Sequence, residues 1–171
     1  DEVACNYDET ATEDDGSCDY GTECWDGSYE CDAEACPEEP VSLSFGNITV
    51  DSMEIVINTP YDIAGFQFNV TQVTLQGASG GLAEENGFTV SVGNSTVIGF
   101  SLQGDVIPEG SSGVLTNLGY VCDYPGETVS CIDNIVISDP DGNALSSLFV
   151  GGCVEVGTTA GCTDEAACNY D

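Results

Sequence analysis

The chain has 171 residues, of which 31 are Asp or Glu and none is Lys, Arg or His, so its formal net charge is −31. A protein without cationic side chains cannot hold nucleic acid through phosphate contacts, an anionic membrane surface would repel it, and no apolar run reaches the roughly 18 residues of a membrane span. Without His or Lys the usual general bases and activated nucleophiles are missing, so the composition predicts a protein that is not an enzyme.

Residues 1–40 are predicted to form a Cys-rich acidic segment. They contain five of the ten cysteines, many acids and almost no aliphatic residues. Such a segment cannot bury an apolar core, so disulfides and bound cations must hold it together. The stretch Cys24–Cys31 is interpreted as a small disulfide-closed loop. Its Trp25 and Tyr29 serve either as a miniature core or, in the less common alternative, as a platform on which a sugar stacks.

Residues 41–157 predict an all-β domain. Short apolar runs with period-two alternation are separated by Gly, Asn, Asp and Pro, as in a β-sandwich or barrel, and no stretch of ten residues has a helical period. The predicted strands are Ser42–Asn47, Met53–Asn58, Ala64–Leu75 with a bend midway, Phe88–Val92, Thr96–Leu102, Gly113–Tyr120, Ile132–Ser138, Ser147–Val150 and Cys153–Val156.

Residues 158–171 are predicted to be a linker and half-repeat that joins the next unit. Residues 164–171 (DEAACNYD) repeat residues 1–8 (DEVACNYD) with one change. Two explanations stay open: one period of a tandem array with a 163-residue repeat, or a discrete subunit whose matching ends meet head to tail. Nine cysteines within residues 1–163 is an odd number, which mildly favours the discrete subunit. Both explanations predict a linear assembly.

The cysteines predict disulfides and an extracellular location. An even set in a chain without His favours disulfides over a zinc site, and oxidised cysteines belong outside the cytosol. Cys5 and Cys18 are expected to brace an acidic loop, and Cys122 and Cys131 to staple a hairpin or loop, although spacing alone does not fix connectivity. Three sequons, Asn47, Asn69 and Asn94, are glycosylation candidates. All ten cysteines are candidates for pairing: Cys5, Cys18, Cys24, Cys31, Cys36, Cys122, Cys131, Cys153, Cys162 and Cys168.

Two parts of the chain resemble known families. The tail GCTDEAACNYD, continued by ETATEDDGSC of the head, resembles an acidic cysteine repeat of secreted bacterial surface proteins and is similar in character to thrombospondin type 3 calcium repeats. This resemblance implies calcium binding. Residues 62–70 (DIAGFQFNV) and 135–143 (IVISDPDGN) resemble a cohesin-type sandwich. That resemblance implies a nine-stranded jelly roll and a role in protein–protein attachment.

Acidic loops are the candidate Ca²⁺ sites, because calcium takes six to eight oxygen ligands on a flexible loop. The alternatives are a solvated acidic loop with Asx turns for the head, and a plain Pro-Asp-Gly turn for residues 139–143. The tail residues could complete a site with the head of the next subunit. The candidate ligands are Asn6, Asp8, Glu13, Asp14, Asp15 and Asp19 in the head, Asp139, Asp141 and Asn143 with help from Asp133 in the turn, and Asp164, Glu165, Asn169 and Asp171 in the tail.

These features predict a structural subunit of an extracellular filament or surface stalk. Its partners would be copies of itself, linked head to tail through calcium-binding Cys-rich ends, and it could also carry glycans. The alternative belongs to another class: a cohesin-like or carbohydrate-binding adhesion module of a larger secreted protein.

Overall fold

The computed structural model describes residues 4–13, 16–122 and 128–157. The contacts within it divide the chain into two compact units, Asp1–Glu39 and Pro40–Asp171. The half-repeat at residues 158–171 lies outside the described residues.

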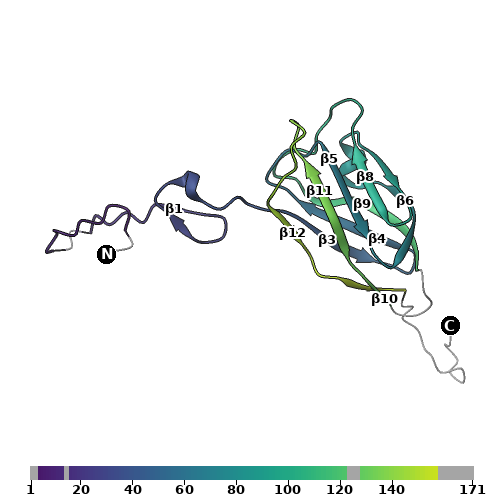
Figure 1. The fold of residues 1–171 in the computed structure, drawn as a ribbon, viewed down its shortest axis with the longest axis horizontal. Coiled ribbons are helices and arrows are strands. Elements are labelled where there is room, and N and C mark those ends of the chain that lie inside the picture. The colour runs from purple at the N-terminus through teal and green to yellow at the C-terminus, as the bar shows by residue number, and fades with distance from the viewer. Residues whose placement is uncertain (1–3, 14–15, 123–127, 158–171) are drawn as a thin grey trace, which may run out of the picture. The chain divides into compact units, whose positions relative to one another are not determined.

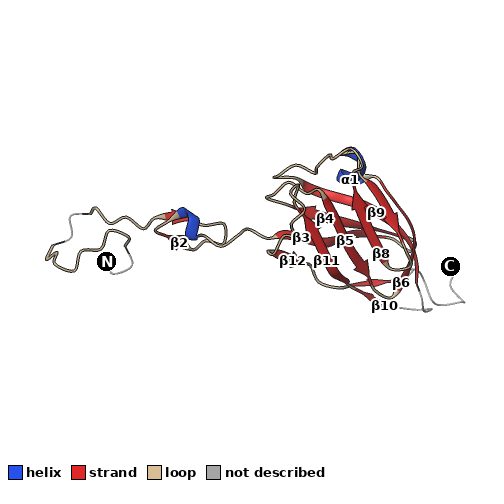
Figure 2. Ribbon diagram, turned by 45° about the horizontal axis from the view of Figure 1, so that its top comes forward, coloured by secondary structure: helices blue, strands red, loops and turns tan. Residues whose placement is uncertain are grey.

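The N-terminal unit contains very little regular structure (Figures 1 and 2). Strands β1 (Thr22–Glu23) and β2 (Tyr29–Glu30) form an antiparallel hairpin. A 3₁₀ turn, η1 (Ala33–Ala35), follows it, and the Asp32 carboxylate caps this turn by accepting the backbone N–H of Glu34 at 3.0 Å. Strands of two residues bury almost nothing, so covalent bonds must hold this unit together.

The disulfides of this unit are Cys5–Cys31 and Cys24–Cys36, with Cα atoms 5.3 and 5.5 Å apart. The expected Cys24–Cys31 closure was therefore wrong. The hairpin register places Thr22 opposite Glu30, which offsets Cys24 from Cys31 by three positions. Three positions along a strand span about 10 Å, beyond the Cα separation that a disulfide tolerates.

The second unit is a β-sandwich of two sheets (Figures 1 and 2). The five-stranded sheet has the order β12-β3-β4-β9-β6, and the four-stranded sheet has the order β11-β5-β8-β7. Pairing in both sheets is antiparallel except between β12 and β3, and β10 pairs with β13 at one side. The strands are β3 (Val41–Ile48), β4 (Ser52–Asn58), β5 (Gly65–Val70), β6 (Val73–Ser79), β7 (Thr89–Val92), β8 (Thr96–Phe100), β9 (Ser112–Cys122), β10 (Thr128–Ser130), β11 (Ile132–Ser138), β12 (Leu148–Val150) and β13 (Val154–Val156).

The all-β prediction is confirmed, with differences at three places. The expected single strand 64–75 is two strands, β5 and β6, which belong to different sheets. The chain crosses between the sheets at Thr71 and Gln72, and Gln72 has a φ of 62°. No Gly or Pro marks this crossing, so the sequence carries no turn signal. Strand β10 and the helix α1 (Gly81–Glu85) were not predicted, because each is shorter than the period that would reveal it.

Helix α1 has five residues, and in the described part of the chain no helix is long and apolar enough to cross a membrane.

The core lies between the two sheets and follows the alternation of the strands. In β4, Met53, Ile55 and Ile57 are each at most 1% exposed, and Phe68 of β5 is fully buried. The Tyr120 hydroxyl donates a hydrogen bond to the carbonyl of Thr49 at 2.7 Å, and burial raises the pKa of this phenol. The sandwich therefore has an apolar core of its own.

A third disulfide, Cys131–Cys153, ties this unit at β10 and β13. Ser130 pairs with Val154, so the next residues, Cys131 and Cys153, stand opposite each other. The expected staple between Cys122 and Cys131 was wrong, because Cys122 lies at the end of β9, in the other sheet from the β11 that Cys131 precedes. Within the described residues, neither Cys122 nor Cys18 forms a disulfide.

Candidate functional site

The outer face of the four-stranded sheet exposes large apolar side chains. Strand β8 reads Thr-Val-Ile-Gly-Phe, so apolar residues occupy both of its faces. Val97 points into the core and is fully buried, whereas Ile98 and Phe100 are 41% and 38% exposed. Leu102, just beyond the strand, is 80% exposed. A half-exposed sheet would normally carry polar residues at these positions.

The register joins these residues to neighbours on the adjacent strands. Gln67 of β5 lies opposite Ile98 on one side and Val136 of β11 on the other, and Val136 is 48% exposed. Phe100 lies opposite Thr89 of β7 on one side and opposite Gly65 of β5 on the other, where no side chain covers the phenyl ring. We name Gln67, Ile98, Phe100 and Val136 the β8 face.

Glycine at position 99 is what allows this division between inside and outside. A Cβ at Gly99 would overlap the ring of Phe66, which is 3% exposed. The Phe66 ring packs over the glycine backbone from the core side and stacks with Phe68 and Phe88 at centroid distances of 6.0 Å. The core directly under the β8 face is therefore aromatic, and the Phe66 ring fills the space beneath Gly99.

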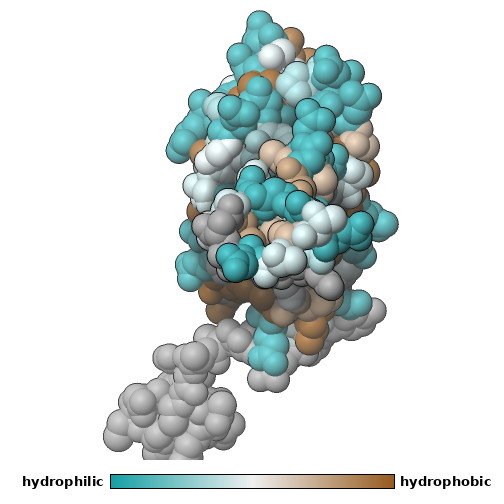
Figure 3. All heavy atoms as spheres, turned by 90° about the vertical axis from the view of Figure 1, so that its left-hand side faces the viewer, coloured by the Kyte–Doolittle hydropathy of each residue, from teal (hydrophilic) through white to brown (hydrophobic). Residues whose placement is uncertain are grey.

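The β8 face is nearly uncharged although the chain carries 31 acids. In the four strands β11, β5, β8 and β7, the sole charged residue is Asp133. Acids reappear at the edges: Asp105, which accepts a hydrogen bond from the Ser101 hydroxyl at 2.9 Å, and Asp139, which follows the end of β11. Figure 3 shows one side of the molecule, where hydrophilic residues cover much of the surface and hydrophobic ones lie in small groups.

The sequence contains a signal for this face. Thr96–Leu102 was predicted as a strand, and its apolar residues at 97, 98, 100 and 102 fall on both faces of a period-two pattern. A strand apolar on both faces is either covered on both sides or exposes an apolar surface.

The predicted calcium ligands in the head mostly bond to their own chain. The Asn6 amide donates to the carbonyl of Ser17 at 2.6 Å and accepts the N–H of Asp19 at 2.8 Å. One Asp8 carboxylate oxygen accepts both the N–H and the hydroxyl of Thr10, which lowers the pKa of Asp8. The Asp19 carboxylate accepts the N–H of Gly21 at 2.9 Å. These are the Asx-turn roles of the alternative interpretation.

The turn at residues 139–143 is likewise closed by hydrogen bonds. The two carboxylate oxygens of Asp139 accept the backbone N–H and the side-chain amide of Asn143 at 2.8 and 3.1 Å. These hydrogen bonds lower the pKa of Asp139, because they favour its charged form. Asp141 is exposed at the tip of the turn, and Gly142 has a φ of 83°.

Among the described residues, no group of three or more Cys, Asp or Glu gathers as a metal would require. No such group therefore includes the candidate ligands that the structure describes, which are Asp8, Glu13, Asp19, Asp139 and Asp141. The remaining candidates, Asp14, Asp15, Asp164 and Asp171, lie outside the described residues, as do Glu165 and Asn169. Calcium binding stays a prediction.

If calcium binds the head, EDTA is expected to lower the melting temperature of the protein. The physical reason is that clustered carboxylates in a chain without cationic side chains repel one another once the ion is removed. Differential scanning calorimetry in calcium and in EDTA measures this, at matched ionic strength because salt alone screens the acids. Identical melting curves in calcium and in EDTA would contradict calcium binding by the head.

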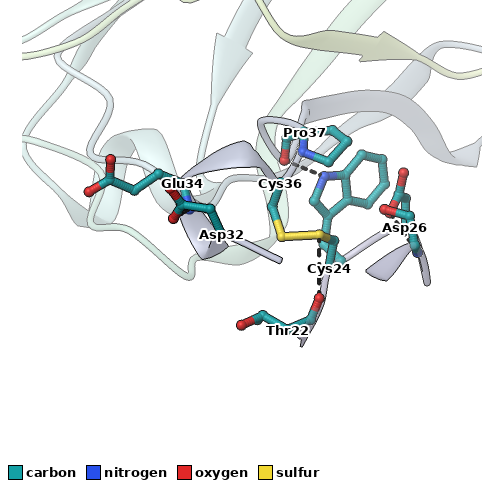
Figure 4. The surroundings of a disulfide bond; sticks show 9 residues. Thr22, Cys24, Asp26, Asp32, Glu34, Cys36 and Pro37 are labelled. Carbon is teal, nitrogen blue, oxygen red and sulfur yellow. Dashed lines mark hydrogen bonds between the residues drawn. A yellow bond between two sulfur atoms is a disulfide. The ribbon is translucent and has the colours of Figure 1, made fainter. Parts of the chain in front are cut away.

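The indole of Trp25 is hydrogen-bonded to the backbone of the N-terminal unit. Figure 4 shows the Cys24–Cys36 disulfide beside Pro37 and Asp26. The Trp25 indole N–H donates to the carbonyl of Pro37 at 2.8 Å, which closes the hairpin onto the segment after η1. Trp25 nevertheless stays 53% exposed and Tyr29 57% exposed.

The three sequons lie in different surroundings, and their glycosylation stays a prediction. Asn47 and Asn94 are exposed. Asn69 lies on β5, where its amide oxygen accepts the hydroxyl of Thr96 at 2.9 Å.

Solved structures similar to this chain are cohesins. The non-cellulosomal cohesin of the archaeon Archaeoglobus fulgidus is 14% identical, and the match covers 69% of this chain and 91% of the cohesin with a TM-score of 0.50. The seventh ScaB type I cohesin of Pseudobacteroides cellulosolvens is also 14% identical and covers 75% and 97%, with a TM-score of 0.52. A chain of the CaDoc0917–CaCohA2 complex is 13% identical and covers 70% and 99%, with a TM-score of 0.50.

The sandwich has the cohesin fold. No protein-family model matches the sequence, and no curated protein matches it. The cohesin-like jelly roll is therefore established at the level of fold alone, since identities of 13–14% do not carry function.

Proposed function

We propose that this chain is a non-catalytic attachment module outside the cytosol, and that its cohesin-like sandwich binds a protein partner through the β8 face. The observation that carries the proposal is this uncharged patch of exposed apolar side chains, Ile98, Phe100 and Val136, on a chain of net charge −31. Contiguous apolar patches on soluble proteins mark interaction sites.

Two further observations support the proposal. Three disulfides are compatible with an oxidising compartment. The structural neighbours are cohesins, and one of the matched chains comes from a complex of two modules, CaDoc0917 and CaCohA2.

The surface predicts the chemistry of the partner. Apolar side chains of the partner would cover Ile98 and Phe100, and a hydrogen-bonding group would meet the Gln67 amide. The acids at the edge, Asp105 and Asp139, call for a basic rim on the partner, since like charges would repel it. We therefore expect a protein module with an apolar centre and surrounding Lys or Arg.

The test uses the intact, disulfide-bonded chain as bait for a displayed library of secreted protein domains from the same organism. Each binder is then measured by biolayer interferometry against Ile98→Asp and Phe100→Asp. We expect each substitution to weaken binding about tenfold or more, because central apolar contacts dominate interface energies and a buried unpaired charge opposes association.

Matched controls place the same charge on the other sheet. Val121→Asp on β9 and Phe149→Asp on β12 change side chains that are 51% and 60% exposed, so they add the same charge away from the β8 face. Binders that lose affinity equally with all four variants, or with the controls alone, would refute the proposed face.

A second candidate function is the linear assembly, which the repetition of residues 1–8 at residues 164–171 favours. In this role the sandwich would be a spacer and the Cys-rich ends would be joints. The two functions are compatible, because a repeated spacer can also present a binding face.

A further inference from the structure

Because residues 164–171 repeat residues 1–8, the cysteines at the two ends of the chain can be aligned. When residues 164–171 are superposed in sequence on residues 1–8, Cys168 corresponds to Cys5. The tail then contributes one more cysteine, Cys162, six positions earlier. A unit placed before this one would thus supply a cysteine six residues ahead of Cys5.

In the folded head, the segment around Cys5 is bound to the residues on either side of Cys18. The Cys5 N–H donates to the carbonyl of Asp19 at 2.6 Å. The Asn6 side chain donates to the carbonyl of Ser17 at 2.6 Å and accepts the N–H of Asp19 at 2.8 Å. Ser17 and Asp19, the neighbours of Cys18, are therefore held against Cys5 and Asn6.

Cys18 is half-buried and forms no disulfide within the described residues, whereas the other four cysteines of its unit are paired. A chain of six residues can span up to about 20 Å, several times the 4.4–6.8 Å between disulfide-bonded Cα atoms. A cysteine six positions ahead of Cys5 can therefore reach Cys18.

We propose that Cys18 forms a disulfide with Cys162 of a second copy of this unit, which completes a module of three disulfides with Cys5–Cys31 and Cys24–Cys36. The second copy is either fused ahead of this unit in one polypeptide or is a separate chain. The inference does not rest on the attachment function proposed for the β8 face.

With the proposed bond, eight of the nine cysteines in one repeat are paired. Residues 1–163 contain nine cysteines. The three observed disulfides use six, and the proposed bond uses Cys18 and Cys162. One cysteine remains, Cys122, which is half-buried at the end of β9. Each repeat therefore has one unpaired thiol, that of Cys122.

The bond forms by oxidation of two thiols. Cys18 and Cys162 together lose two protons and two electrons, and one S–S bond joins them. A small disulfide such as oxidised glutathione accepts the electrons through thiol–disulfide exchange. Its own S–S bond breaks, and it leaves as two thiols.

The experiment uses a two-unit chain, residues 1–163 followed directly by residues 1–171, folded in a glutathione redox buffer. Free thiols are alkylated, the unreduced protein is cut after or before its acids, since the chain has no Lys or Arg for trypsin, and linked peptides are identified by mass spectrometry. Because the two units otherwise give identical Cys18 and Cys162 peptides, the chain carries Cys18→Ser in its first unit and Cys162→Ser in its second. We expect a peptide pair joining Cys162 of the first unit to Cys18 of the second. Cys162 bonded elsewhere, or alkylated together with the second Cys18, would overturn the proposal.

Two variants in the same chain sharpen the outcome. Cys18→Ser in the second unit is expected to release one additional thiol, at Cys162 of the first unit. The matched control, Cys122→Ser in the second unit, is expected to remove one thiol and leave the Cys162–Cys18 pair intact. Loss of that pair in the control would overturn the assignment.

A second arm identifies the source of the partner. Copies of the 171-residue chain labelled with ¹⁴N and ¹⁵N are mixed and oxidised together. Linked Cys18–Cys162 peptides with mixed isotopes show that separate chains join. If the mixture gives no linked Cys18–Cys162 peptide while the junction bond is present in the two-unit chain, the partner is a fused unit and the separate-chain form is overturned. Linked Cys18–Cys162 peptides of a single isotope alone would mean that the bond closes within one copy, which would overturn the proposal.

Discussion

Replacing both members of one N-terminal disulfide, Cys24→Ser with Cys36→Ser, is expected to unfold residues 16–39 and leave the β-sandwich folded. In the described part of the N-terminal unit, Ala4 and Cys24 are the sole buried hydrophobic residues, and its two strands have two residues each. This disulfide spans 12 residues, and closing a loop of that size contributes about 3 kcal/mol by restricting the unfolded chain. Nothing in so small a core can replace that contribution.

Limited proteolysis at acidic residues measures this prediction directly, because the region contains many Asp and Glu. Cleavage within residues 16–39 should accelerate in the variant, while the sandwich keeps its thermal transition. The control is Cys131→Ser with Cys153→Ser, which removes a bond from a unit that has its own core. The two control substitutions should lower the melting temperature of the sandwich and leave the rate of proteolysis of the N-terminal unit unchanged. Protection of residues 16–39 without their disulfide would contradict this account.

The sequence was sufficient to predict the sandwich because its strands depend on local pattern. Alternation in β4, with Met53, Ile55 and Ile57 all buried, is visible in the order of the residues alone. The crossing at Gln72 was not visible, because its left-handed backbone is imposed by two sheets that local sequence does not describe.

The disulfide pairs could not be predicted, because pairing depends on register. Cys131 meets Cys153 since Ser130 pairs with Val154, and β10 is too short to be recognised in the sequence. Cys24 misses Cys31 because the hairpin offsets them by three positions. Spacing counts residues along the chain, whereas a disulfide requires two Cα atoms to be close in space.

The candidate site likewise depends partly on local sequence and partly on strand register. Acidic motifs predicted binding sites in loops such as Asp139–Asn143. In that loop the Asp139 carboxylate accepts hydrogen bonds from the backbone N–H and the side-chain amide of Asn143. The β8 face was hidden inside a correctly predicted strand, since a pattern of apolar residues on both faces does not say which face remains uncovered. The second sheet of the sandwich covers Val97, and the register then places Ile98 beside Val136 through Gln67.

The substitution Phe68→Ala is expected to lower the free energy of unfolding of the sandwich by about 3–5 kcal/mol. Phe68 is fully buried on β5, and its ring centroid lies 6.0 Å from that of Phe66. Removing it leaves a cavity between two sheets whose backbones are fixed by their ladders, so the site cannot collapse to fill the space. This loss is a large part of the 5–15 kcal/mol that stabilises a typical domain.

Urea unfolding followed by circular dichroism measures the loss, with Phe149→Ala as the matched control. Phe149 is 60% exposed on β12, so its truncation should change the free energy of unfolding by no more than about 0.5 kcal/mol. Equal effects of the two substitutions would mean that β5 does not pack against the opposite sheet. The β8 face would then lose its support, because Ile98 and Phe100 project from the strand that pairs with β5 along its whole length.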